Sequence, residues 1–115
     1  MRATEYDAGA LEVAKANVKH NDIQNTIELT HGDAKDAAVQ PSNLVVANVT
    51  IGVHRRICAN YSRAERVLVA GVLCNQVAEM IRLMPQHHPK IIKTSGDWAA
   101  VDFRRTTLRE PRNDR

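Results

Sequence analysis

The stretch Leu44-Val45-Val46-Ala47-Asn48 decides the fold of this 115-residue chain. It is short, apolar and free of alternation with polar residues, which is typical of a strand buried on both faces of a parallel sheet. The turn residues Gln40-Pro41-Ser42 precede it, and Asn48 ends it. A second run of the same kind, Val67-Leu68-Val69-Ala70, occurs later in the chain. The two runs together predict an α/β fold with parallel inner strands.

Three segments around these strands have the apolar spacing of helices. Asp7 is a good N-cap, and the residues after it predict an amphipathic helix from Ala8 to His20. A weaker pattern predicts a helix from about Gly52 to Asn60. The clearest apolar stripe at helical spacing predicts a third helix with its methionines in the core. The stripe consists of Leu73, Val77, Met80, Ile81 and Met84.

The other strands are shorter or lie near the end of the chain. We expect strands at Met1 to Glu5 and at Ile27 to Thr30. Near the C-terminus, Ile91-Ile92 begins a strand, Ser95-Gly96-Asp97 predicts a hairpin turn, and Trp98 to Phe103 alternates as a closing strand. The element order predicts a mostly parallel sheet with an antiparallel C-terminal hairpin. A ligand site is then expected at the carboxyl ends of the parallel strands.

Length and charge indicate one folded domain, which we expect to span residues 1–105. The formal net charge is +3, but the excess is local to the end of the chain. The segment 106–115 is polar and Arg-rich, so we expect a flexible tail there. The body of the chain is close to neutral, which gives no strong reason to propose RNA or a membrane as a partner.

Cysteine usage and hydropathy predict a cytoplasmic protein. Cys58 and Cys74 lie inside apolar stretches and are too far apart for a C-x-x-C motif. We therefore expect two buried free thiols in a reducing compartment. No apolar run reaches the ~20 residues that a membrane helix needs.

The five histidines do not have the spacing of a metal site, so we expect no metal and place the histidines on the surface. His87 and His88 are expected in a solvated loop between Pro85 and Pro89. Ser62 and Ser95 lack the context of a nucleophile elbow, and Cys58 has no evident base, which argues against nucleophilic catalysis.

Polar side chains stand where three expected strands end: Glu5, Asp33 and Asn48. An acid at such a position can accept both ribose hydroxyl protons, a second polar group can meet an adenine amino group, and an amide can both donate and accept. Asp and Asn are also common strand-ending and capping residues, so their spacing alone leaves a purely structural role open.

Five segments resemble class I S-adenosylmethionine-dependent methyltransferases, and several resemble the ribosomal protein L11 methyltransferases among them. Residues 4–18 (TEYDAGALEVAKANV) are similar to the acidic-x-Asp-x-x-Ala-Leu-x-x-Ala-x-x-Asn segment of the class, and Gly32-Asp33 is similar to its third motif. Residues 44–49 (LVVANV), 68–76 (LVAGVLCNQ) and 96–101 (GDWAAV) resemble the Leu-Val-Val-Ala-Asn-Ile, Leu-Ser-Gly-Ile-Leu-x-x-Gln and Gly-Glu-Trp-Val-x-Leu segments of the L11 type.

This resemblance covers residues 3 to 105 and implies a partial Rossmann-like sheet, S-adenosyl-L-methionine as cofactor, and amino groups of a ribosomal protein as acceptor. By position, Glu5 would hold the ribose, Asp33 would lie by the adenine, and Asn48 would line the methyl-transfer site as the catalytic position. The implied cofactor-binding set is Glu5, Tyr6, Gly32, Asp33 and Asn48. Methyl transfer needs in-line positioning and a neutral amine, so no catalytic triad is expected.

The family's first strand and its glycine-rich cofactor loop come before the segment that matches Met1 to Asp7. Without that loop we expect weakened cofactor binding, and the sequence leaves open whether this chain is an active enzyme. Without that strand, two inner sheet edges would be unpaired, at ~1 to 3 kcal/mol per buried unsatisfied group. Domains have a net stability of only about 5 to 15 kcal/mol, so we expect rearrangement, strand exchange or a homo-oligomer.

Two other functions stay open from the sequence. One is a non-catalytic α/β interaction module that binds a partner chain or RNA through its open sheet edge and basic tail. The other is a methyltransferase with a different acceptor, although Asn48-Val49 in place of Asn-Pro argues against the nucleic-acid branch.

Overall fold

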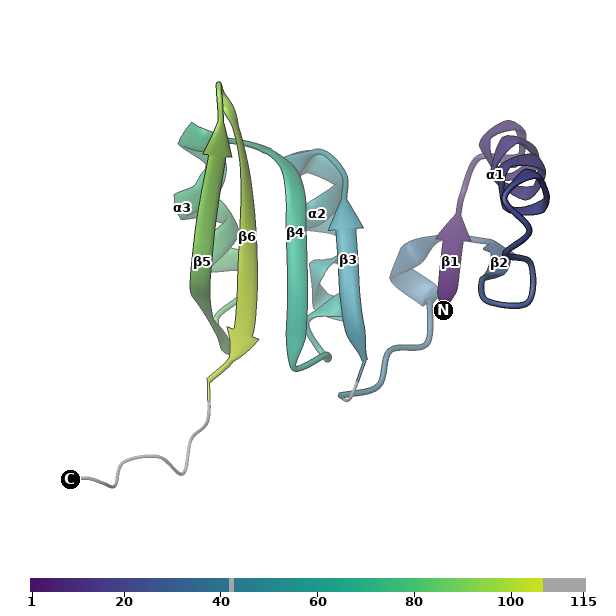
Figure 1. Cartoon of the computed structure of the whole chain (residues 1–115). Coiled ribbons are helices and arrows are strands. Elements are labelled where there is room, and N and C mark those ends of the chain that lie inside the picture. The colour runs from purple at the N-terminus through teal and green to yellow at the C-terminus, as the bar shows by residue number, and fades with distance from the viewer. Residues whose placement is uncertain (42, 107–115) are drawn as a thin grey trace. The chain divides into compact units, whose positions relative to one another are not determined.

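The structure is a computed structural model that describes residues 1–41 and 43–106 (Figure 1). The chain divides into two compact units, Met1–Ala38 and Val39–Arg115, and each is described by itself. The predicted tail lies almost wholly in residues 107–115, outside the described residues. The predicted boundary between residues 105 and 106 therefore stays a prediction.

The N-terminal unit is a βαβ element followed by one turn of 3-10 helix. Its strands β1 (Arg2–Glu5) and β2 (Glu28–His31) pair in parallel, joined through helix α1 (Ala8–His20). The α1 boundaries agree with the prediction because the signals are local. Asp7 caps the helix by accepting a hydrogen bond from the Ala10 amide at 2.8 Å. Basic residues in the last turn complement the negative end of the helix dipole.

The C-terminal unit contains a four-stranded sheet in the order β3-β4-β6-β5. Strand β3 (Leu44–Asn48) pairs in parallel with β4 (Arg66–Leu73), while β6 (Trp98–Arg105) is antiparallel to both β4 and β5 (His87–Ser95). The α/β class, the parallel strands and the antiparallel C-terminal hairpin are therefore confirmed. The hairpin turns at Gly96, whose φ of 59° favours glycine.

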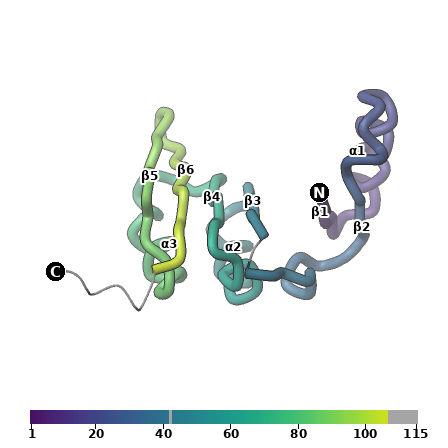
Figure 2. Tube along the Cα trace, turned by 60° about the horizontal axis from the view of Figure 1, so that its bottom comes forward, coloured from purple at the N-terminus to yellow at the C-terminus, as the bar shows by residue number. Residues whose placement is uncertain are grey.

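Two helices cover one face of this sheet, as Figures 1 and 2 show. They are α2 (Ile51–Tyr61) and α3 (Val77–Leu83), the latter preceded by a 3-10 turn, η2 (Cys74–Gln76). The core between the helices and the sheet is mostly aliphatic, and its buried rings are Phe103, Tyr61 and His54. Its largest fully buried apolar side chains are Val67, Val69, Val72, Met80, Met84, Val101 and Phe103.

A bulge in β4 decides which of its side chains enter this core. Val69 pairs with Val101 and Val72 pairs with Ala99, so β4 has one residue more than β6 over this interval. The extra residue lets Val69 and Val72 face the same side although they are three positions apart. The bulge falls at Ala70-Gly71, where Gly71 has a φ of 83°.

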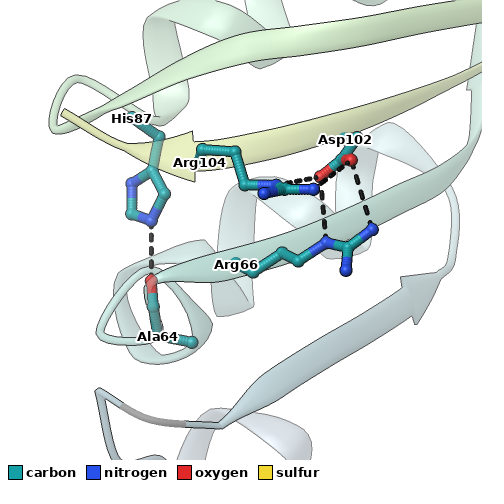
Figure 3. A network of polar contacts seen from close by, with 5 residues as sticks. All are labelled: Ala64, Arg66, His87, Asp102 and Arg104. Atoms are coloured by element: carbon teal, nitrogen blue, oxygen red, sulfur yellow. Dashed lines mark hydrogen bonds and ion pairs between the residues drawn. The ribbon is translucent and has the colours of Figure 1, made fainter.

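The opposite face of the sheet carries an ionic network around Asp102, which is 8% exposed. Asp102 accepts hydrogen bonds from Arg104 at 3.0 and 3.1 Å and from Arg66 at 3.4 and 3.3 Å (Figure 3). The bonds from Arg104, followed by those from Arg66, hold the pKa of Asp102 below its usual range. The registers place Arg66 beside Leu44 and Leu68 beside Val46, so apolar side chains border this ionic network.

The parallel strands of both units have unpaired sides. Among the described residues, β1 pairs only with β2, and β3 pairs only with β4. The expected rearrangement, strand exchange or homo-oligomer stays a prediction. Val46, in the middle of β3, is 67% exposed.

Several local predictions are wrong, each for a tertiary reason. Leu73 ends β4 instead of starting a helix, because the bulge carries the strand past Gly71. His87 and His88 belong to β5, with Pro89 tolerated because β5 is an edge strand. Cys58 is buried as predicted, but Cys74 is exposed because it starts the turn after β4.

The surface placement of the histidines is also wrong for two of them. His54 is fully buried, and His87 is 6% exposed, with Nε2 donating to the Ala64 carbonyl at 2.7 Å (Figure 3). Burial lowers the pKa of both rings. Within the described residues, the His87 Nδ1 atom has no hydrogen-bond partner.

Candidate functional site

The N-terminal unit brings Glu5 and the Gly32-Asp33 pair to one rim. Glu5 and His31 are register partners at the ends of β1 and β2. The Gly32 amide then donates a hydrogen bond to the Glu5 carbonyl at 3.0 Å. The segment that carries Asp33 therefore leaves the sheet directly beside the end of β1. A ligand site is predicted from the sequence at this carboxyl end of the strands.

Both carboxylates at this rim are half-buried and held by backbone groups. The Glu5 Oε2 atom accepts a hydrogen bond from the Asp7 amide at 3.1 Å. The Asp33 Oδ1 atom accepts one from the Lys35 amide at 3.0 Å and so caps the 3-10 turn η1 (Ala34–Asp36). Because a carboxylate can accept several hydrogen bonds, the Glu5 carboxylate retains capacity for a ligand hydroxyl.

The other two residues of the expected set at this rim are more open. Tyr6 is 70% exposed, and its carbonyl accepts a hydrogen bond from His31 Nε2 at 3.0 Å. A Cβ built on Gly32 would meet nothing within 4 Å, so there is room beside this residue. The rim thus combines two fixed carboxylates with an accessible aromatic ring.

Asn48 ends β3 at the edge of an open groove in the C-terminal unit. The groove has a volume of about 760 Å³. Its lining is mostly apolar, with a few polar groups and one aromatic ring, which is the composition of a small-ligand site. Trp98, the single tryptophan of the chain, is 56% exposed there. The lining residues are Asn48, Val49, Thr50, Ala70, Gly71, Lys93, Thr94, Ser95, Trp98, Ala99 and Ala100.

Gly71 allows the β4 bulge to press against the end of β3 on this groove. A Cβ built on Gly71 would lie 2.4 Å from the Val49 carbonyl oxygen and 2.9 Å from the Asn48 Oδ1 atom. Only glycine fits this close approach, and its positive φ favours glycine as well. The packing of the two backbones therefore fixes the position of Asn48 on the groove.

Beneath the groove lies a buried pair of rings from α2. The His54 Nδ1 atom is 2.7 Å from the Tyr61 hydroxyl, and His54 Nε2 is 2.9 Å from the Ala70 carbonyl oxygen. The rings meet edge to face, with centroids 5.9 Å apart. Burial lowers the pKa of His54, although hydrogen bonding to the backbone at Ala70 and Val49 partly offsets this. Burial also raises the pKa of Tyr61.

The expected site residues are thus divided between the two units. Glu5, Tyr6, Gly32 and Asp33 belong to the N-terminal unit, and Asn48 belongs to the C-terminal unit. The roles inferred for them, and the cluster of Glu5, Asp33 and Asn48, stay predictions.

Sequence reasoning missed Gly71, Trp98, His54 and Tyr61 as residues of the groove or its support. His54 and Tyr61 are seven positions apart in α2, with buried Ile57 and Cys58 between them. This i, i+3, i+4, i+7 spacing is the signal that could have placed His54 on the covered face.

The described residues contain neither a metal-binding cluster nor a membrane-spanning helix. Residues 1–41 and 43–106 contain no group of three or more His, Cys, Asp or Glu side chains that could hold a metal ion. Over the same residues, no helix is long and apolar enough to cross a membrane.

Comparison with known families gives one match over nearly the whole chain. The family described as Ribosomal protein L11 methyltransferase (PrmA) matches residues 1–106. A curated relative, the ribosomal protein L11 methyltransferase of Alkaliphilus metalliredigens, is 25% identical over 105 residues, covering 86% of this chain and 33% of the relative. The chain spans about a third of the length of the curated relatives it matches.

Solved structures share the fold. The ribosomal protein L11 methylase of Lactobacillus delbrueckii subsp. bulgaricus superposes with a TM-score of 0.80 at 16% identity, over 92% of this chain and 57% of that chain. Methanocaldococcus jannaschii TYW2, solved in complex with AdoMet, gives a TM-score of 0.65 at 14% identity, over 91% of this chain and 57% of that one. At these identities the likeness establishes a Rossmann-like methyltransferase fold.

Proposed function

The chain belongs to the ribosomal protein L11 methyltransferase (PrmA) family, and from this membership we propose that its residues form part of an S-adenosylmethionine-dependent site that methylates amino groups of ribosomal protein L11. The observation that carries the proposal is the family match over residues 1–106, together with the joint position of Glu5 and Asp33 at one rim. Such an acceptor implies action in the cytoplasm.

The rim of β1 and β2 fits the nucleoside part of the cofactor. The Glu5 carboxylate, fixed by the Asp7 amide, would accept hydrogen bonds from the two ribose hydroxyl groups. Asp33 would lie beside the adenine, with Gly32 leaving room for it and Tyr6 offering an exposed ring next to the rim. When bound, S-adenosylmethionine supplies an electrophilic methyl group on a positively charged sulfur.

The groove at Asn48 fits the acceptor. A lysine side chain has a long apolar stem and one terminal amine, which match an apolar groove with an amide at its end. The Asn48 side-chain oxygen Oδ1 can accept an N–H hydrogen bond from a neutral amine and so direct the amine lone pair. Orientation of this kind is the main contribution that a methyl transfer needs from the protein.

The chain spans about a third of the length of its curated relatives, so the proposal is limited to the residues named above. Calorimetric titration with S-adenosylmethionine tests it. We expect saturable binding that Glu5→Gln weakens about tenfold, because a charged hydrogen-bond partner is worth about 1.5 kcal/mol or more. Glu12→Gln, on the exposed face of α1, is the matched control and leaves the affinity unchanged. No binding at millimolar cofactor, or equal losses in both variants, would contradict the proposal.

A second candidate function is favoured by one observation, the unpaired side of β3. An open, apolar strand edge is a template for a strand from another chain. This would make the chain a non-catalytic module that binds a partner protein. A chain that captures a partner and binds no S-adenosylmethionine would support this candidate over the first.

A further inference from the structure

We infer that His54 is a positioning residue for the groove, tying the end of β3 and the bulge of β4 to helix α2 through its buried imidazole. His54 is fully buried, and the groups around it are the Tyr61 hydroxyl and the backbone of Ala70 and Val49. Its relevance to acceptor binding rests on the proposed function.

The chemistry of these partners fixes the proton arrangement. The Ala70 carbonyl can only accept, so His54 Nε2 carries a proton and donates it. In the neutral ring Nδ1 is then an acceptor, and the Tyr61 hydroxyl donates to it. Hydrogen bonds therefore run in one direction, from Tyr61 through His54 to Ala70. Other tautomers would leave a buried polar atom unsatisfied, which costs about 1 to 3 kcal/mol.

The Ala70 carbonyl, which accepts the hydrogen bond from His54, belongs to the β4 bulge that lines the groove. Ala70 and Gly71 form the β4 bulge, and both line the groove. Gly71 in turn lies against the Val49 carbonyl and the Asn48 side chain. A change in the direction of the Ala70 carbonyl would rotate the Ala70-Gly71 peptide and move the surface that supports Asn48. His54 thus acts on the groove through the backbone, without lining it.

Three variants distinguish a role of His54 in positioning the groove from a role in stabilising the fold alone. His54→Phe keeps a ring of similar size and removes both hydrogen bonds. Tyr61→Phe removes only the hydroxyl donor and leaves the bond from His54 to Ala70, so it keeps the test valid if His54→Phe does not fold. Ile57→Val, a buried truncation in the same helix, is the control and costs about 0.5 to 1.5 kcal/mol.

The first readout is the NMR spectrum of each folded variant. We expect His54→Phe to shift the backbone amides of Val49, Gly71 and Val72 and the side-chain amide of Asn48. Tyr61→Phe should shift the same signals less. Ile57→Val should lower thermal stability and leave these signals in place. Unchanged signals in both His54→Phe and Tyr61→Phe, or equal shifts in the control, would overturn the inference.

The second readout uses Trp98 fluorescence with Nα-acetyl-lysine methylamide as the probe. We expect the probe to bind the wild-type groove. His54→Phe should weaken binding about fivefold, because a displaced Asn48 side chain would lose one hydrogen bond to the probe. If the wild type does not bind the probe, the acceptor assignment of the proposed function fails, while the NMR readout still decides the role of His54. Probe binding that His54→Phe leaves unchanged would overturn the inference.

Discussion

Gly71 lies against Val49 so closely that a Cβ on Gly71 would come within 2.4 Å of the Val49 carbonyl oxygen. The contact joins the bulge of β4 to the residue that follows β3, and both residues line the groove. Because backbone meets backbone here, neither partner can yield by turning a side chain. The position of Asn48 on the groove therefore depends on one glycine.

The first prediction concerns this glycine. Gly71→Ala should destabilise the chain by at least about 1 to 3 kcal/mol, because the positive φ is strained for alanine and the added Cβ meets the Val49 carbonyl. Gly52→Ala is the control, since Gly52 lies in α2 with nothing within 4 Å of an added Cβ. It should stabilise by about 0.5 to 1 kcal/mol. Urea unfolding measures both, and equal effects would show that the close contact is absent.

The second prediction is a loss of stability at mildly acid pH. Burial lowers the pKa of His54, and burial followed by the nearby charges of Arg105 and His88 lowers the pKa of His87, both from 6.5. The unfolded chain then binds more protons than the folded one below pH 6.5. The stability that these neutral rings contribute is fully present above pH 6.5 and is lost as the pH falls toward the folded pKa values.

Each histidine should contribute a slope of up to about 1.4 kcal/mol per pH unit in that range. His54→Gln and His87→Gln should each reduce the slope of the unfolding free energy between pH 7 and 5. His20→Gln, at the exposed end of α1, is the control. Denaturant unfolding at several pH values measures the slope, and a wild-type slope of zero would contradict the buried neutral rings.

The third prediction concerns self-association through β3. This strand has no charge or proline, and among residues 1–41 and 43–106 one of its sides is unpaired, so copies of the chain should pair there at high concentration. Val46→Lys puts a charge in the middle of the strand and should abolish the association. Val13→Lys is the control, because Val13 is similarly exposed, at 61%, but lies on α1. Sedimentation velocity over a concentration series measures this, and a stable wild-type monomer throughout would count against it.

Local signals let the sequence predict α1, the two apolar strands and the closing hairpin. The Asp7 cap, the helical spacing after it and the Gly96 turn all act within a few residues. The errors at Leu73 and Cys74 have a different origin, because both follow from the bulge in β4, which depends on pairing with the distant strand β6. The burial of His54 follows from the helical spacing that it shares with Ile57, Cys58 and Tyr61. The fold tolerates the burial of His54 because Tyr61 and Ala70 form hydrogen bonds with both ring nitrogens.

The candidate site was predictable in part for the same reason. Strand ends can be read from the sequence, so Glu5, Asp33 and Asn48 were found at the carboxyl ends of their strands. The groove beside Asn48 could not be read in this way, because a bulge in β4 and a hairpin more than twenty residues later build it. Trp98 and Gly71 could therefore be identified as groove residues only from the structure.

An NMR titration of the ¹⁵N-labelled chain with S-adenosylmethionine tests whether the cofactor binds at the rim of β1 and β2. Cofactor binding at the rim of β1 and β2 should cause saturable shifts of the backbone amides of Glu5, Tyr6, Gly32 and Asp33. These shifts should be absent in Glu5→Gln at the same cofactor concentration and present in Glu12→Gln. A wild-type spectrum that does not change, or one whose shifts lie away from these residues, would contradict the account.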